Sequence, residues 1–515
     1  MKKTAASILD IFRDKTALLI LGIGFVVRII ASIFVSPGID EAYYGVCSFF
    51  PAWGFFDHPP IVAVTAGFGR WLSGSFSTLS LRFGAILLFI VSAILMYYIV
   101  RSLFNRKAAI FSLLFLHTIP YFFVGMGAFV IPDNALGVFW LLFILSIMKV
   151  HQTQKGAWFL LSGVSLGFAM LSKYHAILLL ASIGFCLIAF KEWRKFWKSP
   201  FLYIGLVISG LIFLPNILWN AHHNWVSYAY QFGKGVGRHS LSFTKFYQGV
   251  LVQAAYLLPW IMVILIMSVI KTIEKNDQKY RWLLPFALLP IGIFTLIGAT
   301  QQILPHWPMP GYLAAIILTC GWMLTWKKPA VKWTFWSTGI VTAVLLIVIV
   351  IHSITGFLNL GVKLDLTLEG YGWEKVIKEL ERRELLDKDT FLFTHKYITG
   401  GELGYAAQKK YPVAVFDKGS AHHFAYWAPM DSLLGMDGIF VMHPRYMTSP
   451  EEKYSEYFEE IIPLSGVMIY RNGKYEMTYN LWLCKNLQKP YPLEYGPGIE
   501  HRSASGRTSS RRLSR

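Results

Sequence analysis

Apolar segments of membrane-spanning length recur through the first two thirds of the chain. A helix needs roughly 20 apolar residues to cross a bilayer, because each residue advances it by about 1.5 Å. Hydrophobic residues make up 55% of the chain and charged residues only 15%, a composition that excludes an ordinary soluble protein. The pattern predicts a polytopic α-helical membrane protein with about 11 transmembrane helices, at 16–35, 81–100, 108–124, 134–147, 158–171, 176–190, 201–219, 249–270, 282–299, 311–326 and 333–354.

The cations of the chain concentrate in alternate loops between these segments. The loops at 1–15, 101–107, 149–155, 191–198, 271–281 and 327–332 carry 20 Lys and Arg residues, whereas the other set carries five. By the positive-inside rule, the first set is cytoplasmic. We therefore expect residues after about 356 to lie outside, and we interpret the net charge of +19 as topological, with no nucleic-acid partner. The apolar run after Met1 is interpreted as the first helix, since no small-residue cleavage site follows it.

Charged residues return after residue 356, and helical and strand patterns begin to alternate. Three domains are expected: a transmembrane catalytic domain over 1–356, a periplasmic α/β domain over 357–496, and a disordered basic tail over 497–515, where Ser and Arg dominate. Of the four cysteines, only Cys47 and Cys484 fall on the outer side, and a disulfide between them is left open. The absence of any N-x-S/T acceptor favours a bacterial inner membrane.

Acids, imidazoles and cations gather at the outer boundary of the expected bundle, where ionisable residues usually have a function. They are Asp40, Glu41, Asp57 and His58 in the first outer loop, Asp133 and Asn134 in the second, Lys173, Tyr174 and His175 in the third, His222, His223, Lys234, Arg238 and His239 in the fourth, and His306 in the fifth. Such a mixture suits an anionic head group beside a group that must lose a proton or bind a metal. A sugar phosphate carried on a lipid fits this description.

Short motifs in this order resemble a known family. They are DEAYY and FDHPP in the first outer loop, PDNAL, LSKYHAILL, LWNAHHNWVSYAYQFGKG and HWPMPGYLA, and they cover most of residues 36–315. Together they look like the bacterial family 39 glycosyltransferases, which have the GT-C fold and include relatives of the protein O-mannosyltransferases and the lipid A aminoarabinose transferase. The resemblance implies transfer of a sugar, with inversion, from a polyprenyl-phosphate donor to a lipid, glycan or protein acceptor.

The resemblance also implies roles for individual residues. Asp40, with Glu41 beside it, matches the catalytic or acceptor-orienting acid of the family, and Asp133 matches a second acid. His58 stands where the aminoarabinose transferases carry Lys, and Asp57 replaces their Glu, a departure that bears on the choice of donor. The candidates for binding the donor phosphate are His58, Lys173, Arg238, Arg28 and Tyr174. Asp57, His222 and His306 are candidates for substrate or metal binding, and a divalent metal is left open as a cofactor.

Each candidate also has a simpler interpretation. Asp40 and Glu41, or Asp133, could cap helices, and the HPP sequence could pin the loop around Asp57 and His58. Arg28 and Lys173 could extend their charges to the interface, and single histidines such as His222 and His306 more often form hydrogen bonds there. As an alternative function, a transporter or flippase would also be polytopic, but its ionisable groups would lie near the bilayer midplane.

Overall fold

A computed structural model of the chain describes residues 7–236, 241–301, 303–418, 422–493 and 496. The chain forms two compact units, each built from separate stretches of the sequence. The first unit comprises residues 1–34, 59–215 and 238–350, and the second comprises residues 35–58, 216–237 and 351–515. The tail expected over 497–515 lies outside the described residues.

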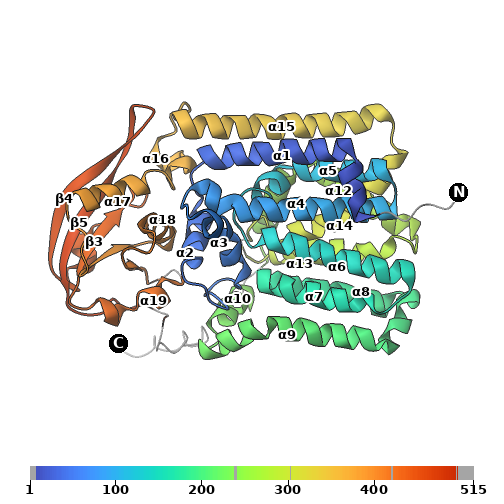
Figure 1. Ribbon diagram of the computed structural model, residues 1–515, viewed down its shortest axis with the longest axis horizontal. Helices are drawn as coiled ribbons and strands as arrows, with labels where there is room; N and C mark the ends of the chain where they lie inside the picture. The colour runs from blue at the N-terminus through green and yellow to red at the C-terminus, as the bar shows by residue number, and fades with distance from the viewer. Residues whose placement is uncertain (1–6, 237–240, 302, 419–421, 494–495, 497–515) are drawn as a thin grey trace, which may run out of the picture. The chain divides into compact units, whose positions relative to one another are not determined.

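The first unit is helical, and several of its long helices run in a similar direction (Figure 1). Its main helices are α1 (Lys15–Phe34), α3 (Ile61–Ser73), α4 (Thr78–Leu103), α5 (Arg106–Thr118), α6 (Asp133–Thr153), α7 (Trp158–Ser172), α8 (Ile177–Ala189), α11 (Phe243–Leu257), α12 (Pro259–Lys275), α13 (Leu284–Ile297) and α14 (Met309–Trp322). Helices α9 (Pro200–His222) and α15 (Lys328–Thr355) begin in this unit and end in the second.

The described part of the chain has five helices that are long and apolar enough to cross a membrane, namely α1, α4, α6, α9 and α15. Two bent pairs of helices would each be long enough to cross a membrane if the pair formed one span. Three further apolar helices are too short to meet the same length criterion. Every segment expected to cross the membrane contains helix, so the protein has the apolar helices of a multi-pass membrane protein. The number of 11 crossings stays a prediction.

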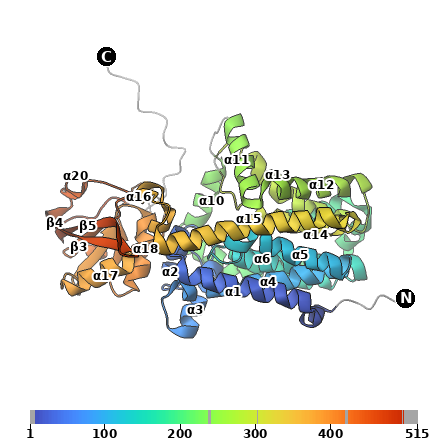
Figure 2. The same ribbon diagram turned by 90° about the horizontal axis from the view of Figure 1, so that it is seen from above.

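The prediction of one unbroken helix over 249–270 is wrong. The segment forms α11 and α12, which meet at an angle of 101° (Figure 2). Pro259 begins α12 and has no N–H group to continue the hydrogen bonds of α11, and a proline also disfavours helical geometry in the residue before it. Leu258 accordingly has a φ of 73°, which ends the first helix.

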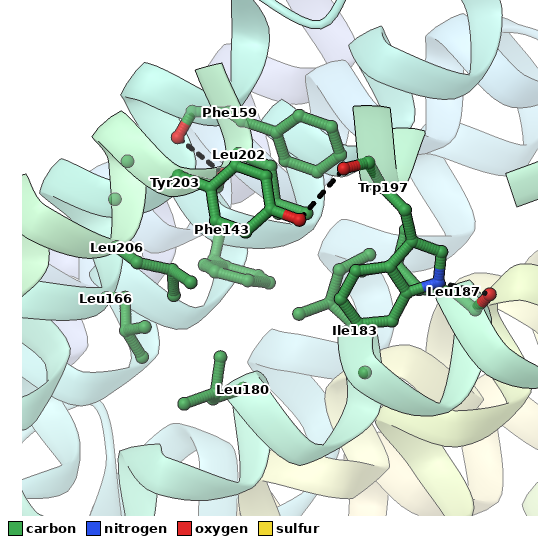
Figure 3. Close-up of a pocket in the computed structure, with 14 residues that line it drawn as sticks. Phe143, Phe159, Leu166, Leu180, Ile183, Leu187, Trp197, Leu202, Tyr203 and Leu206 are labelled. Atoms are coloured by element: carbon green, nitrogen blue, oxygen red, sulfur yellow. Dashed lines mark hydrogen bonds between the residues drawn. The ribbon is translucent and has the colours of Figure 1, made fainter. Parts of the chain in front are cut away.

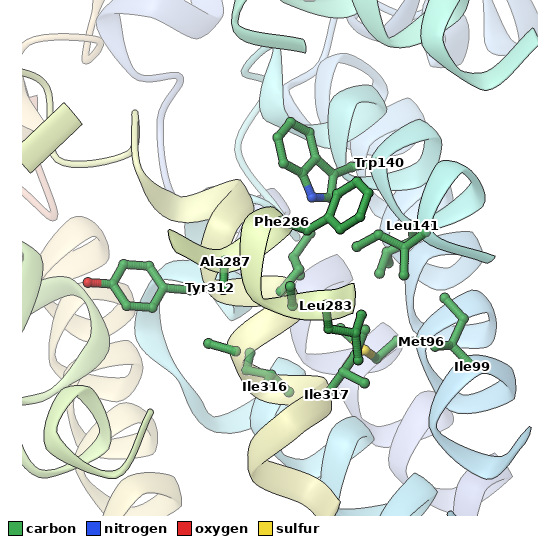
Figure 4. Close-up of a cluster of buried hydrophobic side chains, with 14 of the residues drawn as sticks. Met96, Ile99, Trp140, Leu141, Leu283, Phe286, Ala287, Tyr312, Ile316 and Ile317 are labelled. Atoms are coloured by element: carbon green, nitrogen blue, oxygen red, sulfur yellow. The ribbon is translucent and has the colours of Figure 1, made fainter. Parts of the chain in front are cut away.

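The core of the first unit surrounds α14, which is buried at every residue from Met309 to Cys320. A helix that is apolar on all sides is stable only when other elements cover it. Figure 4 shows Ile316 and Ile317 of this helix among side chains of α4, α6 and α13, including Met96, Leu141 and Phe286.

The second unit contains a five-stranded sheet in the order β2-β1-β3-β5-β4. Strands β1 (Thr390–Thr394), β2 (Val413–Val415) and β3 (Asp437–Met442) are parallel, with Leu392 opposite Val413 and Ile439, whereas β4 (Phe458–Arg471) and β5 (Lys474–Leu487) pair antiparallel. Asn472 and Gly473 join the last two strands with φ angles of 49° and 77°, as a tight hairpin turn requires. All five strands lie after residue 356, where strand patterns alternate with helical patterns in the sequence.

Helices from three regions of the sequence complete this unit. They are α2 (Ile39–Cys47), α10 (Val226–Val236), α17 (Trp373–Arg382), α18 (Tyr397–Ala407) and the short α19 (Phe424–Trp427) and α20 (Pro450–Tyr454). Helix α2 packs closely on α18, because a Cβ atom at Gly401 would lie 3.0 Å from the backbone nitrogen of Tyr43. The first outer loop is therefore folded against residues more than 350 positions away. Cys47 and Cys484 are buried free thiols.

Candidate functional site

The adjacent acids Asp40 and Glu41 have different environments in the first turn of α2. Glu41 is 2% exposed, and its Oε2 accepts a hydrogen bond of 2.8 Å from the backbone N–H of Gly38. Glu41 therefore caps the start of α2, as the simpler interpretation expects, and a catalytic role for Glu41 stays a prediction. Asp40 is exposed, and its role as a base or as an acceptor-orienting acid stays a prediction.

Asp57 is bound to its surroundings through both its side chain and its backbone. Its Oδ1 accepts a hydrogen bond of 2.9 Å from the Tyr43 hydroxyl, and its Oδ2 lies 3.7 Å from Nε2 of His58. The side-chain amide of Gln231 donates to the carbonyl of Asp57 at 2.5 Å. The Asp57 and His58 side chains remain 18% and 21% exposed, so both can still meet a ligand.

Two carboxylates and two phenols form what we call the acid–tyrosine cluster: Asp40, Asp57, Tyr44 and Tyr397. Burial raises the pKa of Tyr44, and the negative charges of Asp40 and Asp57 raise it further. The same causes, in the same order, raise the pKa of Tyr397 to about 12. The geometry agrees, because the ring of Tyr43, whose hydroxyl donates to Asp57, lies 5.7 and 6.4 Å from the rings of Tyr44 and Tyr397. Asp40 lies in the same helix as Tyr44, and 16 residues of sequence separate it from Asp57.

Buried hydrogen bonds fix the backbone of the loop that carries Asp57. The N–H of Phe56 donates to Nδ1 of His423 at 3.0 Å, and the hydroxyl of Ser227 donates to the carbonyl of Phe55 at 3.0 Å. The backbone N–H of His423 donates to the Tyr43 hydroxyl at 3.2 Å. Burial lowers the pKa of His423 to about 3, which keeps its ring neutral and Nδ1 free to accept. The loop is thus held by distant residues rather than by the HPP sequence alone.

In the first unit, Asp133 and Lys173 form a buried ion pair. Their Oδ2 and Nζ atoms lie 2.7 Å apart, and the side chains are 2% and 3% exposed. Pro132 holds the capping position of α6 and no side chain caps this end, so the interpretation of Asp133 as an N-cap is wrong. Lys173 does not extend to the interface either. Desolvation lowers the pKa of its ammonium, and the charge of Asp133 opposes that shift.

The turn before Asp133 is organised by Asn134, which is fully buried. Its side-chain amide donates to the carbonyls of Met126 and Phe129 at 2.7 and 2.9 Å, and its Oδ1 accepts from the N–H of Ile131 at 2.8 Å. Three hydrogen bonds from one side chain define the start of α6 and hence the position of Asp133.

Arg28 is buried in the middle of α1, with 1% of its surface exposed. Its guanidinium donates to the carbonyls of Phe123 and Gly24 at 3.2 and 3.0 Å, and it lies 3.7 and 3.9 Å from the ring centres of Phe89 and Phe123. The interpretation that it extends to the interface is wrong. Arg28 instead holds a single turn of π-helix, η2 (Tyr121–Gly125), and its binding of phosphate stays a prediction.

The remaining candidates lie apart from these groups or outside the described residues. His306 belongs to the first unit, where burial and then the charge of Lys173 lower its pKa to about 4, so it is neutral at physiological pH. Tyr174 is partly buried, and its ring lies 6.3 Å from that of Phe213. His222 is exposed at the end of α9, and Arg238 lies outside the described residues. In the described part of the chain, no three His, Cys, Asp or Glu residues are grouped as a metal site requires.

Sequence patterns did not identify the residues that hold the first loop in place. Tyr397 lies 357 and 340 positions from Asp40 and Asp57, whose charges act on it. His423 lies 367 and 380 positions from its partners Phe56 and Tyr43, and neither Tyr397 nor His423 is part of a motif. Tyr43 and Tyr44 do stand within DEAYY, so the only available signal was their adjacency to Asp40 and Glu41.

Comparison with known proteins defines the class of fold. The chain has the fold of two crystal structures of ArnT from Cupriavidus metallidurans, one in the apo state and one bound to undecaprenyl phosphate. The TM-scores are 0.62 and 0.59, and each match covers 90% of this chain and 97% of the ArnT chain, at sequence identities of 14% and 15%. The chain therefore shares the fold of these two ArnT structures over most of its length.

Sequence comparison points to the same group of proteins. The family model described as dolichyl-phosphate-mannose-protein mannosyltransferase matches residues 57–219. The undecaprenyl phosphate-alpha-4-amino-4-deoxy-L-arabinose arabinosyl transferase of Erwinia tasmaniensis is 24% identical over 270 residues, which cover 48% of this chain and 46% of that protein. The chain thus spans about half the length of this curated relative. These findings confirm the resemblance that the motifs indicate.

Proposed function

We propose that this protein is a membrane glycosyltransferase that moves a sugar from a polyprenyl-phosphate donor to an acceptor on the outer face of a bacterial inner membrane. The observation that carries the proposal is the acid–tyrosine cluster, in which the exposed Asp40 and the partly exposed Asp57 lie near two phenols. Carboxylates and phenols together can accept and donate hydrogen bonds, as recognition of a hydroxyl-rich or amino sugar requires. The similarity to ArnT supports a donor carried on undecaprenyl phosphate.

The chemistry needs one group to receive a proton and another to stabilise the leaving group. In a single displacement, an acceptor hydroxyl attacks the anomeric carbon while the bond to the phosphate breaks, and the configuration inverts. Asp40 would take the hydroxyl proton or orient the acceptor. If the acceptor is a phosphate, as on lipid A, its second pKa of about 6 leaves it nucleophilic without a base. Asp40 would then position it only.

The leaving phosphate requires positive charge or hydrogen-bond donors. His58 is partly exposed in the second unit and is the accessible candidate among the described residues of that loop. Lys173 and Arg28 are buried and already have partners. We assign Lys173 to positioning Asp133 and Arg28 to positioning η2, and either could bind the phosphate only if substrate binding breaks these contacts. Arg238 and Tyr174 complete the proposed set for the donor phosphate, while His222 and His306 remain candidates for substrate contact.

The proposed topology has 11 crossings, with the carboxyl-terminal residues 357–496 forming an α/β domain on the outer side. Labelling of single introduced cysteines tests it in intact cells with a membrane-impermeant reagent. A cysteine in the 149–155 loop should stay unlabelled, whereas one at the exposed Asp431 should react. Labelling of the 149–155 loop from outside would contradict the topology.

Transfer in proteoliposomes tests the function. The purified protein is mixed with radiolabelled undecaprenyl-phosphate sugars and a membrane lipid extract, and the native chain is compared with Asp40→Asn, Asp57→Asn and the control Asp431→Asn. Asp431 is an exposed acid of the same unit outside the cluster. Transfer should fall by about 100-fold or more in Asp40→Asn, within the range expected for one acid–base group, and stay unchanged in the control. If the native protein transfers none of the donors, the alternative of a transporter gains weight.

A further inference from the structure

The first unit contains an apolar pocket. It has a volume of about 100 Å³ and is lined by side chains of α6, α7, α8 and α9, such as Phe143, Leu166, Ile183 and Leu206, with Trp197 at one side (Figure 3). Three of its lining residues are glycines, and a Cβ atom at Gly184 would meet nothing within 4 Å. Gly184 leaves open space on α8, whereas a Cβ atom at Gly163 or Gly205 would clash with a backbone oxygen of the facing helix, so these two glycines let α7 and α9 pack closely beside the pocket. Apolar cavities of this size remain dry and take apolar ligands.

The pocket extends from the middle of the helices, at Leu166 and Leu180, to the end opposite the Asp133–Lys173 pair, at Phe159 and Leu187. Phe143 follows Asp133 by ten residues on α6, and Phe159 precedes Lys173 by 14 residues along α7. At about 1.5 Å per residue, these separations are roughly 15 and 21 Å, at least half the hydrocarbon thickness of a bilayer. A lipid seated here would therefore place its head group at the face of the membrane opposite to Lys173.

A cationic helix, η4 (Lys191–Lys198), lies at that end of the pocket. It is bent by 108° from the preceding α8, and Trp193 and Phe196 are buried while its four cations, Lys191, Arg194, Lys195 and Lys198, are exposed. In a 3₁₀-helix, residues three apart share a face, so the buried aromatics anchor one side and leave the cations on the others. Such a helix, apolar on one side and basic on the other, suits the interface of a membrane.

Contacts join η4 directly to the pocket. Nε1 of Trp197 donates to the carbonyl of Leu187 at 3.2 Å, and the hydroxyl of Tyr203 donates to the carbonyl of Trp197 at 2.9 Å (Figure 3). Nε of Arg194 donates to the carbonyl of Ile188 at 3.1 Å. Leu206, Tyr203 and Trp197 are 40%, 50% and 43% exposed, so the pocket reaches the surface that meets lipid. The cations thus flank an apolar opening to the bilayer.

We propose that this pocket and η4 form a binding site for an anionic phospholipid, separate from the proposed sugar transfer. One acyl chain occupies the space beside Gly184, and the phosphate lies against Arg194, Lys195 and Lys198. A basic residue near the surface favours an anionic lipid by roughly fivefold, so three should give a preference of at least tenfold over a zwitterionic lipid of equal chain length. The proposal does not depend on the transferase activity.

Native mass spectrometry of the full chain tests the site with equal amounts of phosphatidylglycerol and phosphatidylcholine. The variant Gly184→Phe fills the pocket, and the triple variant R194Q/K195Q/K198Q removes the charges. The matched controls are Gly292→Phe, at a half-buried glycine of α13 whose Cβ would also meet nothing, and K327Q/K328Q/K332Q, which neutralises three other exposed lysines.

The native chain should retain phosphatidylglycerol at least tenfold over phosphatidylcholine. Gly184→Phe should lose the bound lipid, the R194Q/K195Q/K198Q variant should reduce the preference to near one, and both controls should match the native chain. Equal retention of the two lipids by the native chain would show boundary lipid only and overturn the proposal. Displacement of phosphatidylglycerol by an equal concentration of undecaprenyl phosphate would assign the pocket to the polyprenyl chain of the sugar donor, and this result would also overturn the proposal.

Discussion

The buried pair of Asp133 and Lys173 gives a stability prediction that can be worked from its geometry. The charged atoms lie 2.7 Å apart, and both side chains are almost fully buried. If one partner is removed, the other charge remains in the interior without compensation, at a cost of about 3–5 kcal/mol. Lys173→Met and Asp133→Asn should therefore each lower the free energy of unfolding by about this amount.

The double variant D133N/K173M separates lost charge pairing from lost packing. It removes both charges and nearly preserves both shapes, so it should recover most of the lost stability, and buried pairs replaced in this way are often neutral. If each single variant loses about 3–5 kcal/mol and the double variant loses at most about 2 kcal/mol, the coupling free energy between the two positions is at least about 4 kcal/mol, above the range of about 0.5–3 kcal/mol that contacting residues usually show.

Lys271 and Glu274 provide a matched control, because their charged atoms also lie 2.7 Å apart but the side chains are 41% and 54% exposed. Lys271→Met should cost less than about 1 kcal/mol, since solvent screens an exposed pair. Unfolding in mixed detergent micelles, followed by circular dichroism, measures both pairs. A Lys173→Met variant as stable as the Lys271→Met control, or a double variant whose loss equals the sum of its singles, would refute the reasoning.

Three further perturbations test individual contacts. Asn134→Ala leaves three hydrogen-bonding backbone groups without their partner, so it should lower the free energy of unfolding by at least about 1–3 kcal/mol in the same assay. The control Asn105→Ala removes a single helix cap and should lower it by about 1 kcal/mol. His423 has a folded pKa of about 3, below the unfolded value of about 6.5, so the unfolded state binds more protons between these pH values. The protection of the Phe56 amide from hydrogen exchange should therefore fall as the pH drops from about 6.5 toward 3. His423→Gln, which can accept the same bond without titrating, should flatten that dependence, and an unchanged slope would contradict the assignment. Glu41→Gln should keep the cap to Gly38 in weakened form and lower stability by up to about 1 kcal/mol, whereas Glu41→Ala should lose it; equal stability of the two variants would argue against the capping role.

The helices of this protein follow from its sequence because their cause is local. A run of apolar residues must satisfy its own backbone hydrogen bonds in lipid, so each long run forms a helix wherever the rest of the chain goes. The strands of the second unit are predictable for a similar reason, since their alternating pattern and the Asn472–Gly473 turn are local signals. Leu258 shows the limit, because a proline within an apolar run broke a helix that the hydropathy of the run indicates.

The partners of the first outer loop could not be predicted, because they depend on contacts across the sequence. Tyr43 and His423 are separated by 380 positions, and no local pattern links them. The same holds for the grouping of residues 35–58 with residues 351–515, which follows from packing between α2 and α18 at Gly401 rather than from a shift in composition. Residue chemistry identified Asp40 and Asp57, but only the fold brings them near the same phenols.

The cations show why a charge in an apolar region is a weaker indicator of a ligand site than it looks. Burial of Lys173 or Arg28 is costly whether or not a phosphate ever arrives, so the resting protein must supply a partner. The chain does this with a carboxylate for Lys173 and with carbonyl oxygens and aromatic rings for Arg28. Lys173 is 3% exposed and paired with Asp133, so a donor phosphate could contact it only after its surroundings open, beside an acid that the family resemblance places in the reaction. His58, which is partly exposed beside Asp57, carries no such requirement and is therefore the first of the proposed phosphate ligands to test.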